Sequence, residues 1–250
     1  MATTQSKSIP RTNGEGDAHS TKLIMLTSAA TIVALALGRW WIVHILVCIP
    51  AWLHVARLAP PREENDLRTM VLRWGVAVFL VTLTASAFIP ERAVSSVFHG
   101  DEIARTTELW LSGQGSHPWG IWAMVVLPLA FAAITGASGG LLGWLMLSVL
   151  LGNAAIVAAT LFAHGHNIVQ VAVIALAPWQ WAFFAGAWLL FEPLSALSAR
   201  RVLPDSRLRF DWTSNRRTIY IGAGFMILAL LLHLTTSGAY SALVSRWTTA

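Results

Sequence analysis

Long apolar runs separated by short polar segments dominate the hydropathy pattern of the chain. A transmembrane helix needs about 20 mostly apolar residues to cross about 30 Å of hydrocarbon. Runs such as Leu141 to Leu151 are continuously apolar and do not alternate with polar residues, so they predict helices rather than the strands of a membrane barrel. The pattern predicts an all-α transmembrane bundle of seven helices, at residues 23–37, 40–56, 70–89, 119–135, 141–163, 168–191 and 219–240.

Polar segments flank the predicted bundle at both ends of the sequence. Residues 1–22 are rich in Ser, Thr and Gly, which predicts a disordered tail, and residues 242–250 predict a short C-terminal tail. Only Gly38 and Arg39 separate the first two apolar runs. A six-helix bundle in which these two runs form one helix therefore stays open as an alternative.

The composition points to an integral membrane protein. Of the 250 residues, 56% are hydrophobic and 12% are charged, which is about half the charged fraction of a soluble domain. The net charge is +5, yet the basic residues are spread over short segments between apolar runs, a pattern that speaks against nucleic-acid binding. Cys48 is the only cysteine, so an internal disulfide and a cluster of thiolate metal ligands are both excluded.

The distribution of basic residues predicts the orientation of the bundle. Lys and Arg are retained on the cytoplasmic side of short loops. With seven helices and a cytoplasmic N-terminus, thirteen Lys and Arg residues fall on the cytoplasmic side and four on the outer side, whereas six helices reduce this bias to ten against seven. We therefore expect seven helices, a cytoplasmic N-terminus and an outer C-terminus in the cell (inner) membrane.

The acidic residues bear on function through their positions. All twelve lie outside the predicted spans or at their very ends, Glu192 before Pro193 being the nearest. Proton pumps and proton-coupled carriers usually keep an ionisable group in the middle of the membrane. The sequence thus argues against a carboxylate-based proton relay, and it favours a non-enzymatic, transport-related or scaffolding membrane subunit that acts with partner proteins.

A cluster of polar residues between the fifth and sixth predicted helices supports the alternative function. His164 and His166 could ligate a metal ion, and the long outer loop from Pro90 to Pro118 could supply a further ligand. A tight turn would also use polar residues here to satisfy free helix ends. The alternative is therefore a membrane-embedded enzyme or metal-binding protein with an outer-face histidine cluster, completed by His99, Asp101, Glu102 or His117.

Small residues at helical spacing predict close helix packing. Gly139 and Gly143 form a GxxxG pair, and Ala182 and Gly186 lie one turn apart. Such residues let helix backbones approach closely in lipid, where no hydrophobic force drives helices together. The predicted packing positions, within the bundle or toward a partner, are Gly136, Gly139, Gly140, Gly143, Ala182 and Gly186.

The predicted cytoplasmic segment from Ser195 to Thr218 is basic. It contains six arginines and two acidic residues. Each basic group near a membrane surface gains about 1 kcal/mol from anionic lipid headgroups. The sequence therefore predicts that this segment contacts anionic lipids, and docking of a cytoplasmic protein stays open.

Two short fragments resemble motifs of intramembrane proteases. Residues 136–139 spell GASG and resemble the GxSG motif of rhomboid proteases, which implies Ser138 as a nucleophile and a histidine two helices later; here His164 lies only one crossing away. Glu63, Glu64 and Arg68 resemble the EExxxR motif of CAAX-type metalloproteases, and Phe162 with His166 resembles its FxxxH. The predicted topology places these two groups on opposite faces of the membrane.

Overall fold

The computed structural model describes residues 14–53, 64–206 and 208–248, and all regular elements in these ranges are helices. Because the longer apolar runs are continuous, each satisfies its backbone hydrogen bonds within one segment. The helices are α1 (Gly14–Leu37), α2 (Trp40–Leu53), α3 (Glu64–Phe88), α4 (Pro90–Ser95), α5 (Gly100–Leu111), α6 (Ile121–Ala137), α7 (Leu141–Ala163), α8 (Ile168–Ile174), α9 (Pro178–Val202) and α10 (Trp212–Thr248).

Four of the described helices are long and apolar enough to cross a membrane, judged by length and composition. They cover Leu67–Phe88, Leu141–Ala163, Pro178–Val202 and Trp212–Trp247. Three shorter apolar helices accompany them, at Thr21–Leu37, His44–Leu53 and Ile121–Ala137. The chain is therefore a helical, membrane-embedded protein.

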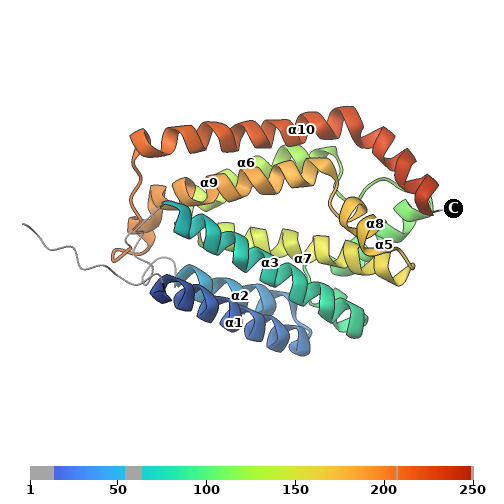
Figure 1. Cartoon of the computed structure of the whole chain (residues 1–250), viewed down its shortest axis with the longest axis horizontal. Coiled ribbons are helices and arrows are strands. Elements are labelled where there is room, and N and C mark those ends of the chain that lie inside the picture. The colour runs from blue at the N-terminus through green and yellow to red at the C-terminus, as the bar shows by residue number, and fades with distance from the viewer. Residues whose placement is uncertain (1–13, 54–63, 207, 249–250) are drawn as a thin grey trace, which may run out of the picture.

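The long helices run alternately in opposite directions, so that the connections gather at two ends of the bundle (Figure 1). One end, called here the N-end, holds the start of α1, the α6–α7 turn at residues 138–140 and the α9–α10 connection at residues 203–211. The opposite end, the C-end, holds the α1–α2 turn, α4, α5, α8 and the last turns of α10. Residues far apart in the sequence therefore meet at each end.

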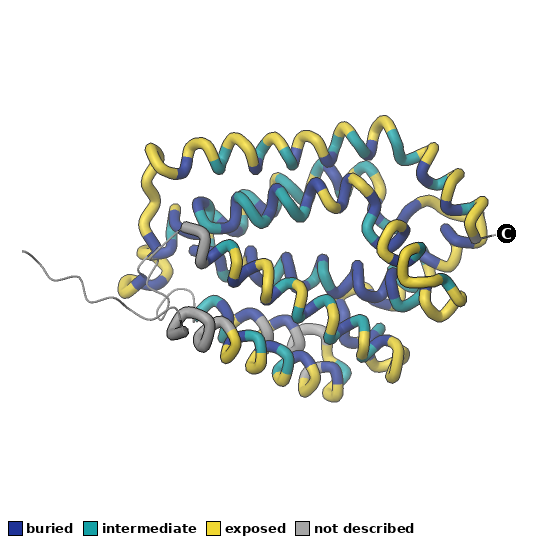
Figure 2. Tube along the Cα trace, viewed as in Figure 1, coloured by how far each residue is buried: buried dark blue, intermediate teal, exposed yellow. Residues whose placement is uncertain are grey.

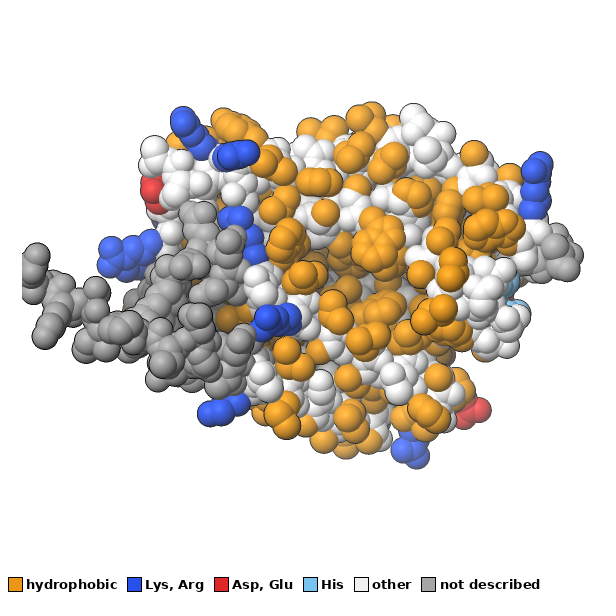
Figure 3. All heavy atoms as spheres, viewed as in Figure 1, with side chains coloured by type: hydrophobic (Ala, Val, Ile, Leu, Met, Phe, Trp, Pro, Cys, Tyr) orange, Lys and Arg blue, Asp and Glu red, His pale blue; other side chains and the backbone are white. Residues whose placement is uncertain are grey.

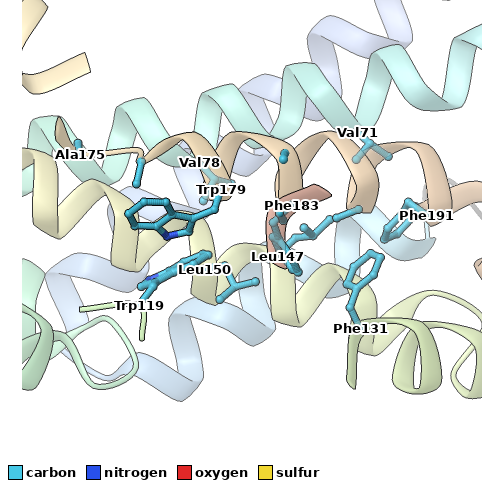
Figure 4. Packing of buried hydrophobic residues seen from close by; sticks show 14 of the residues in the cluster. Val71, Val78, Trp119, Phe131, Leu147, Leu150, Ala175, Trp179, Phe183 and Phe191 are labelled. Carbon is cyan, nitrogen blue, oxygen red and sulfur yellow. The ribbon is translucent and has the colours of Figure 1, made fainter. Parts of the chain in front are cut away.

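The helices pack as two groups. In the first group α7 packs against α3, α2 and α5, and α1 packs against α2 and α3; in the second, α9 packs against α10 and α6. Large aromatic side chains fill the contact between the groups, and Phe183 of α9 lies beside Leu147 of α7 (Figure 4). The Trp144 ring lies 4.5 Å from that of Trp74 and 4.8 Å from that of Phe191, in edge-to-face arrangements.

The outside of the bundle is apolar between the two ends. Along α3 and α10 the exposed and buried positions alternate with the helical period (Figure 2), and the exposed ones include large side chains such as Leu80 and Leu231. On the face seen in Figure 3 hydrophobic side chains cover the middle, and Lys and Arg lie mainly toward the ends, most of them at the N-end. This is the surface expected of a protein that lipid surrounds.

The predicted helix at residues 168–191 differs most from the structure, which divides it into α8 and α9. Ala177 is extended, Pro178 begins α9, and the Gln180 side chain accepts a hydrogen bond from the Ala177 N–H at 2.7 Å. The hydropathy pattern does not reveal this break, because Ala175 to Ala177 are apolar. Proline at the first position of a helix marks a helix start, and that signal identifies the break.

Several other boundaries also differ from the expected spans. α1 begins at Gly14, inside the expected tail, and α10 runs from Trp212 to Thr248, so most of the expected C-terminal tail is helical. α9 continues past Pro193 to Val202, which places Glu192 inside a helix. Residues 1–13, 54–56 of the second expected span, and 249–250 lie outside the described residues.

Candidate functional site

The histidine pair predicted as a metal site lies in the α7–α8 turn at the C-end. Gly165 has a φ of +82°, which glycine adopts without strain, and it lets the chain reverse between His164 and His166. The His164 side chain is exposed and that of His166 is half-buried. The two side chains that follow serve the helix end: Asn167 Oδ1 accepts the Val169 and Gln170 N–H groups, and Gln170 Oε1 accepts the Asn167 N–H.

The hydrogen bond of His164 fixes which of its nitrogens can act as a ligand. His164 Nδ1 lies 2.8 Å from the Thr160 carbonyl oxygen. A carbonyl only accepts, so Nδ1 carries the proton and the lone pair of a neutral ring is on Nε2. This is the tautomer that metal-binding histidines adopt when a backbone carbonyl orients them.

The structure does not gather the further ligands around this pair. Among the described residues no group of three or more His, Cys, Asp or Glu side chains could hold a metal ion. His99 pairs instead with Glu102, at 3.0 Å between Nδ1 and Oε2, and Asp101 is exposed in the first turn of α5. His117 is buried in a separate cluster of rings. His164 and His166 are therefore the ligands that this turn itself offers.

The buried rings around His117 form a cluster that the sequence patterns did not indicate. The His117 ring lies 4.8 Å from that of Trp110 on α5 and 5.2 Å from that of Trp179 on α9, both edge-to-face. Its Nδ1 accepts the Trp119 N–H at 3.0 Å, so Nε2 carries the proton. The Nε2 atom is buried without a hydrogen-bond partner, and burial lowers the pKa of His117 to about 4.

Two side chains of α10 complete this ring cluster. His233 Nε2 lies 3.2 Å from the Trp119 carbonyl oxygen, to which it donates, and its ring lies 4.9 Å from that of Trp179. The Tyr240 hydroxyl donates to the carbonyls of Val173 and Ile174, at 2.7 and 3.0 Å. We call Trp110, His117, Trp119, Trp179, His233 and Tyr240 the ring cluster. It joins α5, the start of α6, α8, α9 and α10 at the C-end.

A charged pair joins the two helix groups toward the N-end. Arg68 Nε on α3 lies 3.3 Å from Glu192 Oε2 on α9, and each side chain is 14% exposed. The same arginine donates from Nη2 to Thr218 Oγ1 on α10, at 3.2 Å, while its carbonyl accepts the Trp188 indole N–H. Glu192 is thus a helical, partly buried carboxylate with a charged partner, which corrects the expectation that it lies at a helix end.

The predicted packing positions contact helices of the same chain. A Cβ atom at Gly186 would lie 2.9 Å from the Gly222 carbonyl oxygen, so α9 and α10 approach closely there. A Cβ atom at Gly139 would lie 2.9 Å from Ala199 Cα. At the other positions Gly136, Gly140 and Gly143 face Leu197, Ser195 and Thr135, and Ala182 is buried.

The fragments that resemble protease motifs are separated in the fold. Ser138 lies in the N-end turn before α7, whereas His164 follows the last residue of α7 at the C-end (Figure 1). At 1.5 Å per residue, the 23 residues of α7 separate the two side chains by about 35 Å. Arg68 and His166 are likewise at opposite ends, and Glu63 lies outside the described residues. Neither arrangement can form one active site.

A different serine–histidine pair lies inside the first helix group. Ser148 Oγ on α7 is 2.6 Å from His44 Nδ1 on α2, and it also donates to the Leu145 carbonyl at 3.0 Å. Cys48, one helical turn from His44, is buried beside the same serine. Both His44 and Ser148 are buried, so this pair serves contact between α2 and α7.

Comparisons with known proteins add no family to this description. No protein-family model matches the chain, and neither a curated protein nor a solved structure is significantly similar to it. The arguments about function therefore rest on the residues and contacts described above.

Proposed function

We propose that the protein crosses the inner membrane seven times, with its N-terminus in the cytoplasm and its C-terminus outside. The crossings would be α1, α2, α3, α6, α7, α9 and α10. Their alternating direction supports this topology, because successive connections lie at opposite ends of the bundle (Figure 1). The basic residues support the orientation: Arg200, Arg201, Arg209, Arg216 and Arg217 all belong to the N-end connection or the helix turns beside it.

Within this topology we propose a transport-related or scaffolding membrane subunit that acts with partner proteins. The observation that carries the proposal is the use of the buried polar groups. Arg68 pairs with Glu192, His44 with Ser148, and His233 with the Trp119 carbonyl, each across two different segments. The close glycine contacts serve the same purpose. The buried polar groups therefore hold the helices in fixed positions. This suits a subunit that presents surfaces to partner proteins.

The N-end connection is the surface that we propose for anionic lipids. The expected segment 195–218 is mostly helical: its first part ends α9, its last part begins α10, and only residues 203–211 connect them. Arg200 and Arg201 lie in the last turn of α9, and Arg216 and Arg217 in the second turn of α10. Four guanidinium groups on two adjacent helix ends fit phosphate-rich headgroups, at about 1 kcal/mol for each group near the surface.

The topology is tested by labelling single cysteines in whole cells. In a Cys48→Ala background, a cysteine at Ala250 should react with a membrane-impermeant maleimide in intact spheroplasts. A cysteine at Arg209 should react only after the membrane is opened. The reverse pattern would overturn the proposed orientation, and reaction of both sites would show that α10 does not cross the membrane and would overturn the seven crossings.

The subunit role is tested by the state of the protein in a mild detergent. We expect a complex larger than the chain with its detergent belt, containing a second protein in a fixed ratio. A monodisperse single chain, with no second protein after cross-linking in the membrane, would contradict this role.

The proposed lipid surface is tested by the lipid that remains bound after purification. Arg200→Gln with Arg201→Gln should reduce the retention of phosphatidylglycerol, whereas the C-end variant Arg105→Gln should not.

The tautomer of His164 favours one second candidate, a metal-binding function at His164 and His166. The Thr160 carbonyl orients the ring and leaves Nε2 as the available lone pair. Zinc or copper added to the purified protein should then bind in a fixed ratio, and His164→Ala with His166→Ala should abolish binding. His99→Ala is the matched control at the same end. Equal metal uptake by the double variant would remove this candidate.

A further inference from the structure

A hollow of about 520 Å³ lies at the C-end, between the first turn of α8 and the end of α10. Ile168, Val169 and Trp247 supply its apolar walls, and Asn167 and Gln170 complete its lining. The volume lies within the range of sites that bind small molecules. We call this space the α8 hollow.

Two contacts fix the position of α8 along α10. The Tyr240 hydroxyl donates to the carbonyls of Val173 and Ile174 at the end of α8, at 2.7 and 3.0 Å. Trp247 lies beside the first turn of α8, across the hollow. The seven residues of α8 span about 10 Å, and so does the step from Tyr240 to Trp247. α8 therefore lies beside the last turns of α10 and runs in the opposite direction.

The length of α10 bears on where these last turns lie relative to the membrane. α10 has 37 residues and is about 55 Å long, whereas a bilayer with its headgroups is about 40–45 Å thick. Its end bends away from the axis of the rest of the helix, toward α5 and α8 (Figure 1). Trp247 is exposed on this bent end, and exposed tryptophan is typical of the membrane–water interface. The bent end and α8 thus belong at the level where acyl chains meet headgroups.

The outward side of α8 is apolar although it is exposed. Ile168 is 73% exposed and Val169 is 67% exposed, and Val173 continues the same exposed side. A helix that faces water turns polar side chains outward. The polar side chains of the first turn serve the helix cap instead, since the oxygens of Asn167 and Gln170 accept backbone N–H groups. The outward side therefore needs an apolar neighbour.

Lipid fits this neighbour better than a protein does. Leu243, one turn before Trp247, is also exposed and connects the hollow to the apolar surface of α10. Stable protein interfaces take about 20–30 residues on each side, whereas five residues line the hollow. On the face seen in Figure 3, hydrophobic side chains continue from the middle of the bundle toward the C-end. The hollow is thus an extension of the surface that lipid surrounds.

We propose that the α8 hollow binds an acyl chain of a phospholipid from the membrane leaflet at the C-end. The chain lies against Ile168 and Val169 and passes beside the indole of Trp247. Its binding covers exposed apolar side chains and holds α8 against α10. The inference requires a membrane-embedded bundle, and it is independent of the orientation and of the subunit role proposed above.

Spin labels test whether lipid covers α8. In a Cys48→Ala background in lipid nanodiscs, a label at Val169→Cys should collide often with oxygen, which concentrates among acyl chains, and rarely with a water-soluble nickel chelate. Leu231→Cys on α10 is the reference for lipid, and Glu102→Cys on α5 is the reference for water at the same end. A label at position 169 that behaves like the one at position 102 would overturn the proposal. Few collisions with both reagents would mean that protein covers α8, which would overturn it as well.

Competition distinguishes a bound chain from lipid that only passes over the surface. In mixed micelles, a nitroxide-labelled phosphatidylcholine should quench a fluorophore at Ile168→Cys at a several-fold lower lipid content than one at Leu231→Cys, because the hollow retains the chain. Trp247→Ala removes one wall and should abolish this difference, whereas Trp212→Ala, at the other end of the same helix, should preserve it. Equal quenching at the two positions, or a difference that persists in Trp247→Ala, would contradict a chain bound in the hollow.

Discussion

The two ends of the bundle hold the same helix groups together by different chemistry. Toward the N-end, Arg68 and Glu192 join α3 to α9 as opposite charges, and Gly139 lets the α6–α7 turn lie directly against α9. At the C-end the ring cluster joins α5, α9 and α10 through imidazole and indole rings. One end depends on two charges remaining opposite, and the other depends on His117 remaining uncharged.

The difference follows from what each end has to bring together. Toward the N-end two helices pass each other, so a single pair of side chains can span them. At the C-end a long connecting segment between α3 and α6 contains α4 and α5. This segment must be held against α9 and α10. Large rings suit that task because each one contacts several segments at once. Disturbing the two ends separately should therefore give different signatures.

The largest effect is expected from breaking the charged pair of the N-end. Arg68→Met removes one partner and leaves the Glu192 carboxylate partly buried between helices, at a cost of about 3 kcal/mol. The exposed Arg73→Met, five residues further along the same helix, should change stability far less. The free energy of unfolding, measured in mild detergent, distinguishes the two variants.

A double variant separates the pair from the size of either side chain. Arg68→Met with Glu192→Leu removes both charges, and it should recover most of the stability lost in the single variant because no charge is left unpaired. If the double variant is as unstable as the sum of the two single variants, the charges do not act as a pair and the comparison between the ends fails at this point.

Acidification should weaken the C-end by a similar amount. The pKa of His117 falls from about 6.5 to about 4 on burial, so between these pH values the unfolded chain binds a proton that the folded chain does not. The contribution of the uncharged His117 to the free energy of unfolding is therefore fully present above pH 6.5. It is lost as the pH falls toward 4, by about 3 kcal/mol in all. Unfolding curves recorded at intervals from pH 7.5 to pH 4 measure this loss. His164→Gln, at an exposed histidine, should leave it unchanged.

The sequence predicted the helical, membrane-embedded class of the protein because hydrophobic length is a local property. It did not predict the helix break before Pro178, since Ala175 to Ala177 continue the apolar run. Glu192 was placed at a helix end because Pro193 follows it, yet a proline costs only the hydrogen bond that its missing N–H would make and the room for its ring. α9 continues through Pro193 while packed against α10.

The two candidate sites likewise differ in how far the sequence could predict them. The turn at His164 to Gln170 could be located from neighbouring residues alone, and its capping hydrogen bonds were among the expected alternatives. The ring cluster could not, because His117 meets partners that lie at positions 110, 179 and 240. No local spacing carries that information. The buried tryptophans and histidines far apart in the chain were visible in the sequence, but only the packing of α5 against α7 and α10 brings them together.

Replacing His117 itself should have an intermediate effect and should also sharpen the pH experiment. His117→Phe keeps a ring beside Trp110 and Trp179 but leaves the Trp119 N–H without an acceptor, at a cost of about 1–3 kcal/mol. The acid-dependent loss of stability should become much smaller in this variant. His117→Asn is the complement, since it retains an acceptor and loses the ring. Unchanged acid dependence in His117→Phe would assign the titration to another group.

The smallest effect is expected at the edge of the ring cluster, from Tyr240→Phe. This change removes the hydroxyl that donates to the carbonyls of Val173 and Ile174 and leaves the ring in place, so it should cost about 1 kcal/mol. Because both acceptors lie at the end of α8, hydrogen exchange should rise at residues 174–177 and remain unchanged around Arg68. Tyr220→Phe, at an exposed tyrosine of the same helix, is the control. Faster exchange at both ends would mean that the N-end and the C-end of the bundle open as one cooperative unit rather than separately.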